Sequence, residues 1–155
     1  MKDYIALAAC KGSSPARHFP EIRTRTHLMT RLLDRRDCVR LIWAPAGFGK
    51  TALALDYADT IFGFSHVFWF DATSPCFVRD VDNGDFAARI LEEDGHAACV
   101  IIDGVPSLNE LRLRALHQAA GELLAHDCEV LLTAASMSGR SFQVSRMRWR
   151  RLLVA

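Results

Sequence analysis

Short apolar runs alternate along this chain with segments in which apolar residues recur every three or four positions. The runs have the length of strands and contain almost no polar residues. Such strands are buried on both faces of a parallel sheet that helices cover. They lie at Val39–Trp43, His66–Phe70, Ala97–Asp103 and Cys128–Ala134. The alternation predicts a three-layer α/β/α fold with a mostly parallel sheet.

The first three segments at helical spacing have recognisable ends. From Thr24 or Thr26 onward, leucines alternate with arginines, and we interpret the arginines as a solvated face rather than as phosphate contacts. Lys50–Phe62 predicts a second helix, which Gly63 ends. A short third helix is predicted to begin at Phe86. The aromatic side chains of the strand before it, HVFWF, are expected in the core rather than on a base-stacking surface.

Two further segments carry clear local signals. Asp71–Asp85 holds Pro75 and Gly84, and we interpret it as a polar loop. Ser107–Glu110 matches the capping box S-x-x-E, which predicts a helix from there to about Ala125. The stripe of that helix expected to face inward consists of Leu108, Leu111, Ala115, Ala119 and Leu123.

Composition and charge narrow the function only a little. With 155 residues, 50% hydrophobic and 24% charged, the chain suits one globular domain. A net charge of +1 gives no general attraction to nucleic acid or acidic membranes. Five cysteines without C-x-x-C spacing favour a reducing cytoplasm over disulfides or a zinc site. Tyr4–Ala9 before Cys10 is too short for a secretory signal, and no run reaches the roughly 18 apolar residues of a membrane helix.

The first motif that carries chemistry lies between the first predicted strand and the helix after it. Residues 44–51 read APAGFGKT, close to the phosphate-binding consensus G-x-x-x-x-G-K-[ST]. Its glycines let successive backbone N–H groups point at phosphate oxygens, and the helix start adds partial positive charge. The alternative is an ordinary strand–turn–helix with a chance Gly-Lys-Thr. Both flanking elements favour the phosphate-binding interpretation.

This motif assigns side chains and backbone to a nucleotide. Lys50 would reach the β- and γ-phosphates, and the Thr51 hydroxyl would ligate Mg²⁺. Ala44 replaces the first consensus glycine, and alanine is the least obstructive substitute where φ is negative. The expected nucleotide-binding residues are Pro45, Ala46, Gly47, Phe48, Gly49, Lys50, Thr51 and Ala52.

A second motif ends the strand predicted at Ala97–Asp103. An aspartate at this place, one helix–strand–helix after a phosphate-binding loop, holds the Mg²⁺ shell opposite the loop threonine. We therefore assign Asp103 to the metal with Thr51, and to catalysis with Lys50. The next residue, Gly104, supplies no second acid, so we expect at most slow hydrolysis.

Other catalytic roles have weaker candidates. Glu110 and Asp71 are the acids left for a base, although capping explains Glu110 more simply. The fourth strand ends where a polar group would sense a γ-phosphate, and the candidates there are Thr133, Ser136 and Arg140.

The two ends of the chain differ from its middle. We expect a flexible lead-in arm over residues 1–22, the core over 23–139 and a basic tail over 140–155. The tail predicts either a helix or, at Leu152–Ala155, a short edge strand. Trp149 among arginines would suit nucleic acid, but we favour a plain basic tail.

The loop APAGFGKT and the segment Ile22–Leu33 before it together resemble one known family. They are similar to the STAND-class P-loop NTPase domain of the MalT-like, LuxR-type large ATP-binding transcriptional regulators. The resemblance covers about Phe19–Ser136. It implies a P-loop NTPase with sheet order 5-1-4-3-2, the fifth strand being weak or missing here. It also implies ATP and Mg²⁺ as cofactors, with adenine contacts near Ile22 and Arg25.

The chain departs from that family at two strand ends. The regulators usually carry a second acid after the third strand, where this chain has Asp103-Gly104. They often end the fourth strand with arginine, where this chain has Ala134-Ala135-Ser136. The family's DNA-binding helix-turn-helix has no counterpart in these residues, so the chain is expected to be a fragment or a short relative.

Three functions follow, from different classes. The first is an ATP-binding, slowly hydrolysing switch module that contacts other domains or chains of a regulator and reaches DNA only through a helix-turn-helix outside this sequence. The second is a small ATPase or phosphotransferase. The third is an interaction module that keeps the fold without nucleotide. All three place the protein in the cytoplasm without a membrane partner.

Overall fold

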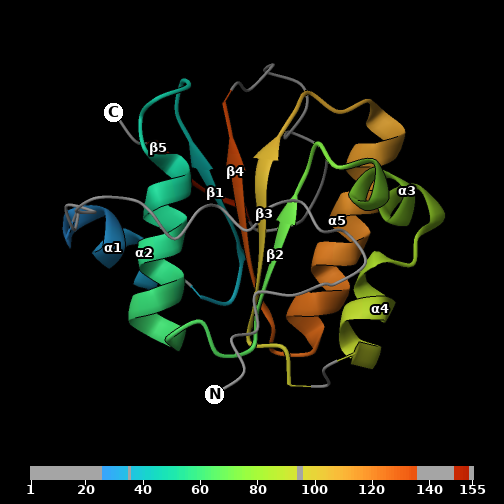
Figure 1. Cartoon of the computed structure of the whole chain (residues 1–155), viewed down its shortest axis with the longest axis horizontal. Coiled ribbons are helices and arrows are strands. Elements are labelled where there is room, and N and C mark those ends of the chain that lie inside the picture. Colours follow the sequence, from blue (N-terminus) through green and yellow to red (C-terminus); the bar gives the residue numbers. More distant parts are fainter. Residues whose placement is uncertain (1–25, 35, 94–95, 136–148, 154–155) are drawn as a thin grey trace.

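The computed structural model is built around a five-stranded sheet with all its strand pairs parallel (Figure 1). The structure describes residues 26–34, 36–93, 96–135 and 149–153. The strand order is β2-β3-β4-β1-β5, which confirms the order 5-1-4-3-2 when it is counted from the other edge. The strands are β1 (Val39–Trp43), β2 (Val67–Asp71), β3 (Cys99–Val105), β4 (Glu129–Ala134) and β5 (Trp149–Leu153).

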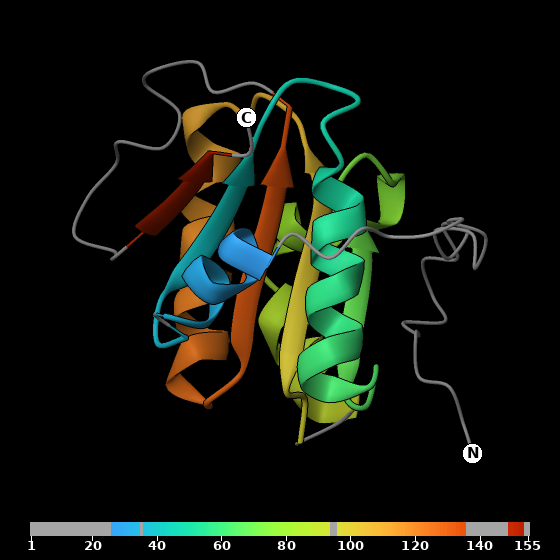
Figure 2. The ribbon, with the colours of Figure 1, turned by 90° about the vertical axis from the view of Figure 1, so that its left-hand side faces the viewer.

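Helices cover both faces of the sheet, which confirms the predicted three layers (Figure 2). On one face lie α1 (Thr26–Leu33) and α2 (Lys50–Phe62). The other face is covered by α3 (Pro75–Asn83), α4 (Phe86–Glu93) and α5 (Glu110–Ala125). Residues of β1–β4 point alternately to the two faces, and both sets are mostly apolar, so the core has two halves.

The elements that carry the phosphate-binding motif have the bounds expected from sequence. β1 and α2 begin and end where the apolar pattern predicts them. Gly63 ends α2 with φ 53°, and its N–H donates to the Asp59 carbonyl at 2.8 Å. Phe68 and Phe70 of β2 are buried, as the core interpretation requires.

The polar loop predicted over Asp71–Asp85 is wrong, because α3 occupies most of it. Pro75 stands at the first turn of this helix and Gly84 follows its end with φ 78°, so both act as helix boundaries. Phe77 and Val81, four residues apart, are buried and attach the helix to the core. The sequence contains this apolar spacing, but the turn-forming residues around it favour a loop when the sequence is considered alone.

The capping-box prediction for α5 is also wrong in detail. Asn109 is the N-cap, and its side chain accepts a hydrogen bond from the Arg112 N–H at 2.9 Å. The helix thus begins at Glu110. Of the stripe expected to face inward, Ala119 and Leu123 are buried and Leu108 and Ala115 pack against the core, whereas Leu111 is 77% exposed. The buried positions of α5 are Leu113, Leu116, His117, Ala119, Ala120 and Leu123.

Near the C-terminus the structure decides between two expectations. Over Trp149–Leu153 the chain is a strand, β5, which pairs with β1 throughout its length. The strand therefore starts three residues before the predicted Leu152–Ala155. Within the described residues, no helix is both long enough and apolar enough to cross a bilayer.

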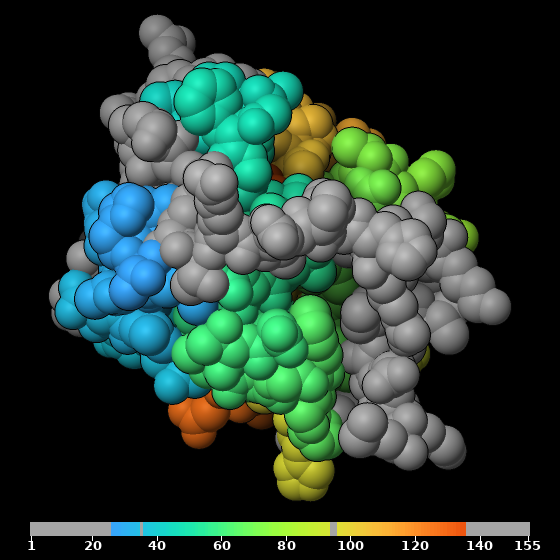
Figure 3. Space-filling model, turned by 60° about the vertical axis from the view of Figure 1, so that its left-hand side comes forward, coloured from blue at the N-terminus to red at the C-terminus, as the bar shows by residue number. Residues whose placement is uncertain are grey.

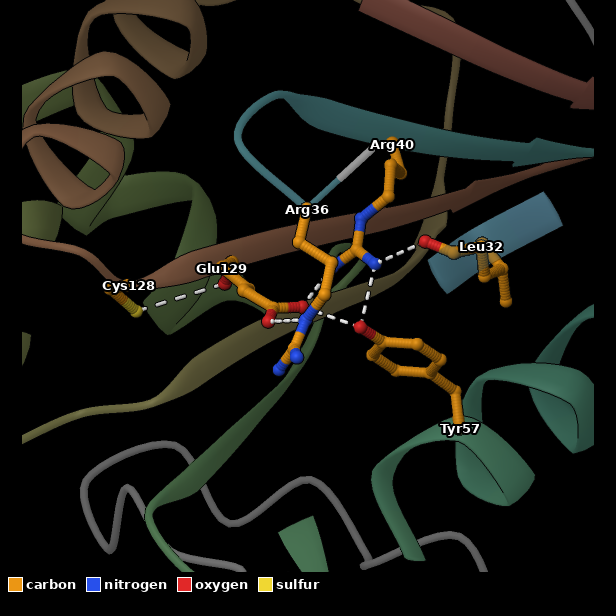
Figure 4. A network of polar contacts seen from close by, with 6 residues as sticks. All are labelled: Leu32, Arg36, Arg40, Tyr57, Cys128 and Glu129. Atoms are coloured by element: carbon orange, nitrogen blue, oxygen red, sulfur yellow. Dashed lines mark hydrogen bonds and ion pairs between the residues drawn. The ribbon is translucent and has the colours of Figure 1, made fainter. Parts of the chain in front are cut away.

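A buried charge network joins α1, α2, β1 and β4 at the amino end of the sheet (Figure 4). Arg40, the single polar residue in β1, is 1% exposed. Its guanidinium donates to the Leu32 carbonyl at 2.8 Å, to the Tyr57 hydroxyl at 2.7 Å and to Glu129 at 2.5 Å. Arg36 adds a second ion pair to Glu129.

Tyr57 completes this network because its hydroxyl both accepts and donates. It accepts from Arg40 and donates to the Glu129 carboxylate at 2.6 Å. Burial raises the pKa of Tyr57 to about 12, so the donating proton is present at neutral pH. The guanidinium of Arg40 also lies 4.7 Å from the centre of the Tyr57 ring. Its charge is therefore compensated inside the core.

Replacing Glu129 tests the importance of this network for stability. We expect Glu129→Gln to lower the free energy of unfolding by about 3–5 kcal/mol, because it leaves Arg40 as an uncompensated buried charge. Urea denaturation at neutral pH measures the loss. Arg36→Ala is the matched control: its side chain is 46% exposed, and such pairs contribute about 1 kcal/mol or less. Equal losses in the two variants would contradict the assignment.

Candidate functional site

The loop between β1 and α2 lies at the carboxyl edge of the sheet, and Pro45–Phe48 are exposed at the surface (Figure 3). Gly47 and Gly49 adopt φ of 84° and 74°, a region that side-chain-bearing residues seldom enter. Gly49 is the N-cap of α2 and its carbonyl accepts the first helical hydrogen bond, from Leu53, at 2.9 Å. The loop therefore leads directly into the positive end of a helix.

Ala44, which stands where the consensus has glycine, is explained by its surroundings. It is fully buried, and its N–H donates to the Ala134 carbonyl at 3.3 Å, which extends the pairing of β1 with β4. Among the described residues, side-chain-bearing positions with positive φ are Phe64, His66 and Asp127. Ala44 thus keeps an ordinary strand-like backbone, and a glycine is not required there.

Lys50 and Thr51 open α2 on the loop side. The Lys50 ammonium group donates to the Pro45 carbonyl at 2.9 Å, so its side chain lies back along the loop. Thr51 points instead toward β3. Its hydroxyl oxygen is 3.0 Å from both carboxylate oxygens of Asp103, a residue 52 positions further along the chain. The structure thus brings together the two residues that the sequence assigned to a metal.

The Thr51–Asp103 pair has the chemistry that Mg²⁺ requires. Both side chains are half-buried and offer oxygen atoms, the ligands that this hard cation prefers. No group of three or more His, Cys, Asp or Glu side chains suited to a metal occurs in the described part of the chain. Mg²⁺ is commonly held by one or two carboxylates together with phosphates and water. The residues present therefore fit a magnesium–nucleotide site.

Thr133, at the end of β4, makes a further contact with Asp103. It is fully buried, and its hydroxyl donates to Asp103 Oδ1. The same hydroxyl oxygen accepts from the Gly104 N–H at 2.8 Å. The sequence suggested Thr133 for a role toward phosphate, but the described contacts connect it to the aspartate. A polar residue ending the strand beside the aspartate was the signal for this contact.

Gly104, which stands where a second acid would follow Asp103, lies at an irregularity in the pairing of β3 with β4. The β3–β4 register shifts between Ile102 and Val105, and Gly104 has φ 73°. A glutamate here would have to adopt a left-handed backbone that is uncommon for it, whereas aspartate tolerates this region better, as Asp127 with φ 58° does. The backbone at this point therefore disfavours glutamate more than aspartate.

The other acids proposed as bases lie in different places. Glu110 sits at the exposed start of α5 and pairs with Arg114, and no described contact connects it to Asp103. Asp71, in contrast, is the register partner of Asp103 on β2. Its carboxylate accepts from the Thr73 N–H at 2.8 Å and hydroxyl at 2.6 Å. The remaining candidates, Ser136, Arg140, Ile22 and Arg25, lie outside the described residues.

Asp71 was a weak candidate in the sequence because nothing there placed it beside Asp103. Neighbouring strands lie about 4.8 Å apart, and register partners in a parallel pair point to the same face. Trp69 and Ile101, two residues before the aspartates, both pack in the core half under α2. Asp71 and Asp103 thus share the α2 face of the sheet at its carboxyl edge.

Comparisons with known proteins support the fold alone. No protein-family model matches the sequence, and no curated protein is significantly similar to it. Among solved structures, the replication initiator DnaA bound to AMPPCP and single-stranded DNA aligns with a TM-score of 0.57 at 13% identity, over 81% of this chain and 44% of that one. AMPPCP-bound DnaA from Aquifex aeolicus aligns at 0.51 and 14% identity, over 81% and 44%.

A third structure broadens the set of neighbours. The E. coli MS115-1 HORMA:CdnC:Trip13 complex aligns with a TM-score of 0.52 at 15% identity, over 85% of this chain and 48% of the matched chain. The chain thus spans less than half the length of these neighbours. At such identities the likeness concerns architecture and not activity. Together with the geometry above, it shows that this chain has the three-layer fold of P-loop NTPase-type proteins.

Proposed function

We propose that this chain is a nucleotide-switch module that binds ATP with Mg²⁺. The observation that carries the proposal is the 3.0 Å contact between Thr51 and Asp103, beside a glycine loop that opens a helix. A hydroxyl and a carboxylate from segments 52 residues apart meet where β- and γ-phosphates lie in P-loop proteins. Two of the solved neighbours, both DnaA, contain the ATP analogue AMPPCP.

Each element of the loop has a separate role in this proposal. The backbone N–H groups of residues 45–52 bind phosphate oxygens at the positive end of α2. Lys50, which reaches the Pro45 carbonyl in the described arrangement, turns its ammonium group to the β- and γ-phosphates. Thr51 and Asp103 hold the metal, whose charge offsets that of the phosphates.

The finer part of the proposal concerns the type of protein. APAGFGKT and the segment Ile22–Leu33 resemble the LuxR-type regulators, in which such a domain is one part of a longer chain. We infer that ATP biases the arrangement of this domain against other domains or chains of a regulator in the cytoplasm. DNA would be contacted only through a helix-turn-helix outside this sequence.

Lys50→Ala tests nucleotide binding. We expect the dissociation constant for a fluorescent ATP analogue to rise about 10- to 100-fold, because a hydrogen bond to a charged group contributes about 1.5–3 kcal/mol. Fluorescence titration with Mg²⁺ present measures it. Arg114→Ala is the charge-matched control, since Arg114 lies 67% exposed on α5; its affinity should not change. Tight binding by Lys50→Ala would refute the proposal.

A second candidate function is slow ATP hydrolysis with Asp71 as the base. The observation that favours it is the register pairing of Asp71 with Asp103, which places a second carboxylate at the carboxyl edge despite Gly104. One oxygen of Asp71 accepts both hydrogen bonds from Thr73. Those contacts orient the carboxylate, and its other oxygen remains to accept a proton from water.

Asp71→Asn separates hydrolysis from binding. Asparagine retains a carbonyl oxygen that can accept from Thr73, so the turn after β2 should persist. We expect an unchanged affinity for ATP and a fall of about 100-fold or more in phosphate release, because general-base catalysis contributes about that much. Phosphate release by Asp71→Asn at the wild-type rate would exclude Asp71 as the base.

A further inference from the structure

The hydroxyl of Thr133 has its hydrogen-bonding roles determined by its partners. A hydroxyl has one proton to donate and two lone pairs that accept. The Gly104 N–H can only donate, so Thr133 accepts that bond. An ionised carboxylate can only accept, so the single proton of Thr133 goes to Asp103 Oδ1. Thr133 therefore has no proton left for a phosphate oxygen.

The geometry of Asp103 follows from these two bonds. The Gly104 N–H meets the Thr133 side chain where β3 leaves regular pairing with β4, so Thr133 holds the irregularity that contains Asp103. Its donated proton occupies one side of Oδ1, while Thr51 contacts both Oδ1 and Oδ2. The carboxylate is thus held between β4 and the first turn of α2.

We propose that Thr133 is a positioning residue that aims the Asp103 carboxylate at Thr51 and so sets the Mg²⁺ dependence of nucleotide binding. This inference rests on the proposed function. It differs from a sensor role, in which the side chain would contact the γ-phosphate itself. Side chains that orient a metal ligand through a hydrogen bond typically change metal affinity by about 10- to 100-fold when they are replaced.

The sensor and positioning roles make different predictions for two ligands. A residue that contacts the γ-phosphate affects ATP but not ADP, with or without metal. A residue that acts through Asp103 affects only binding that involves Mg²⁺. Thr133→Val is the variant of choice, because it retains the branched shape of a side chain that is 0% exposed and removes the hydroxyl. Thr133→Ser restores the hydroxyl.

The experiment titrates Mg²⁺ at constant concentrations of protein and fluorescent ATP analogue. We expect Thr133→Val to bind the analogue like wild type in EDTA. It should require at least about 10-fold more Mg²⁺ than wild type to reach half of the metal-dependent gain in affinity. Thr133→Ser should return the Mg²⁺ midpoint to within about threefold of wild type, since it keeps the hydrogen bonds. Asp103→Asn should abolish most of the metal-dependent gain.

The outcomes distinguish this inference from the proposed function. An unchanged Mg²⁺ midpoint in Thr133→Val, with wild type binding normally, overturns the positioning role alone. A metal-independent loss of affinity for the ATP analogue, with ADP unaffected, overturns it in favour of a sensor. Wild-type protein that binds no nucleotide refutes the proposed function itself. If Thr133→Val does not fold, Thr133→Cys, whose thiol is only a weak donor, is compared in the same way.

Discussion

Strand β4 lies between β1 and β3. Its side chains on the face covered by α2 make polar contacts at both the amino and the carboxyl end of the sheet. Residues 129, 131 and 133 point to this face in turn: Glu129 is at the amino end, Leu131 is in the apolar core and Thr133 is at the carboxyl end. Glu129 binds Arg40 and Tyr57, while Thr133 binds Asp103. Because Tyr57 belongs to α2 and Asp103 contacts Thr51, the helix is attached through polar groups at both ends of β4.

This arrangement has a consequence for the proposed nucleotide site. The start of α2 cannot move relative to β3 without breaking the Thr51–Asp103 contact, and the middle of α2 is held by a buried charge network with short hydrogen bonds. A binding site on rigid elements costs less free energy to order when the ligand binds than a site on mobile elements. Under the proposed function, sheet packing holds the loop, Thr51 and Asp103 in place before the metal–phosphate group binds.

The backbone at Gly104 bears on hydrolysis rather than on metal binding. In the proposed function, Asp103 and Thr51 ligate Mg²⁺ together with phosphates and water, but activating water requires a base in addition. The residue after Asp103 is Gly104, which has no side chain to supply one, and its positive φ disfavours glutamate at that position. A carboxylate on the neighbouring strand, Asp71, stands nearest in the register. A binding module with slow hydrolysis is consistent with both features.

The sequence by itself determined the strands, most helices, the layer order and the glycine loop between β1 and α2, because apolar periodicity and glycine placement act locally. Resemblance to a family added the strand order. The tertiary structure alone decided what depends on neighbours distant in sequence, such as the burial of Arg40 against Glu129. The helix α3 and the N-cap at Asn109 rest instead on local signals, because Pro75 and Gly84 bound α3 and Asn109 caps the Arg112 N–H three residues away. The tertiary structure also decided the contacts of Thr133 and the pairing of Asp71 with Asp103. These contacts form only when the parallel strands align at one edge of the sheet. No local sequence pattern specifies that alignment.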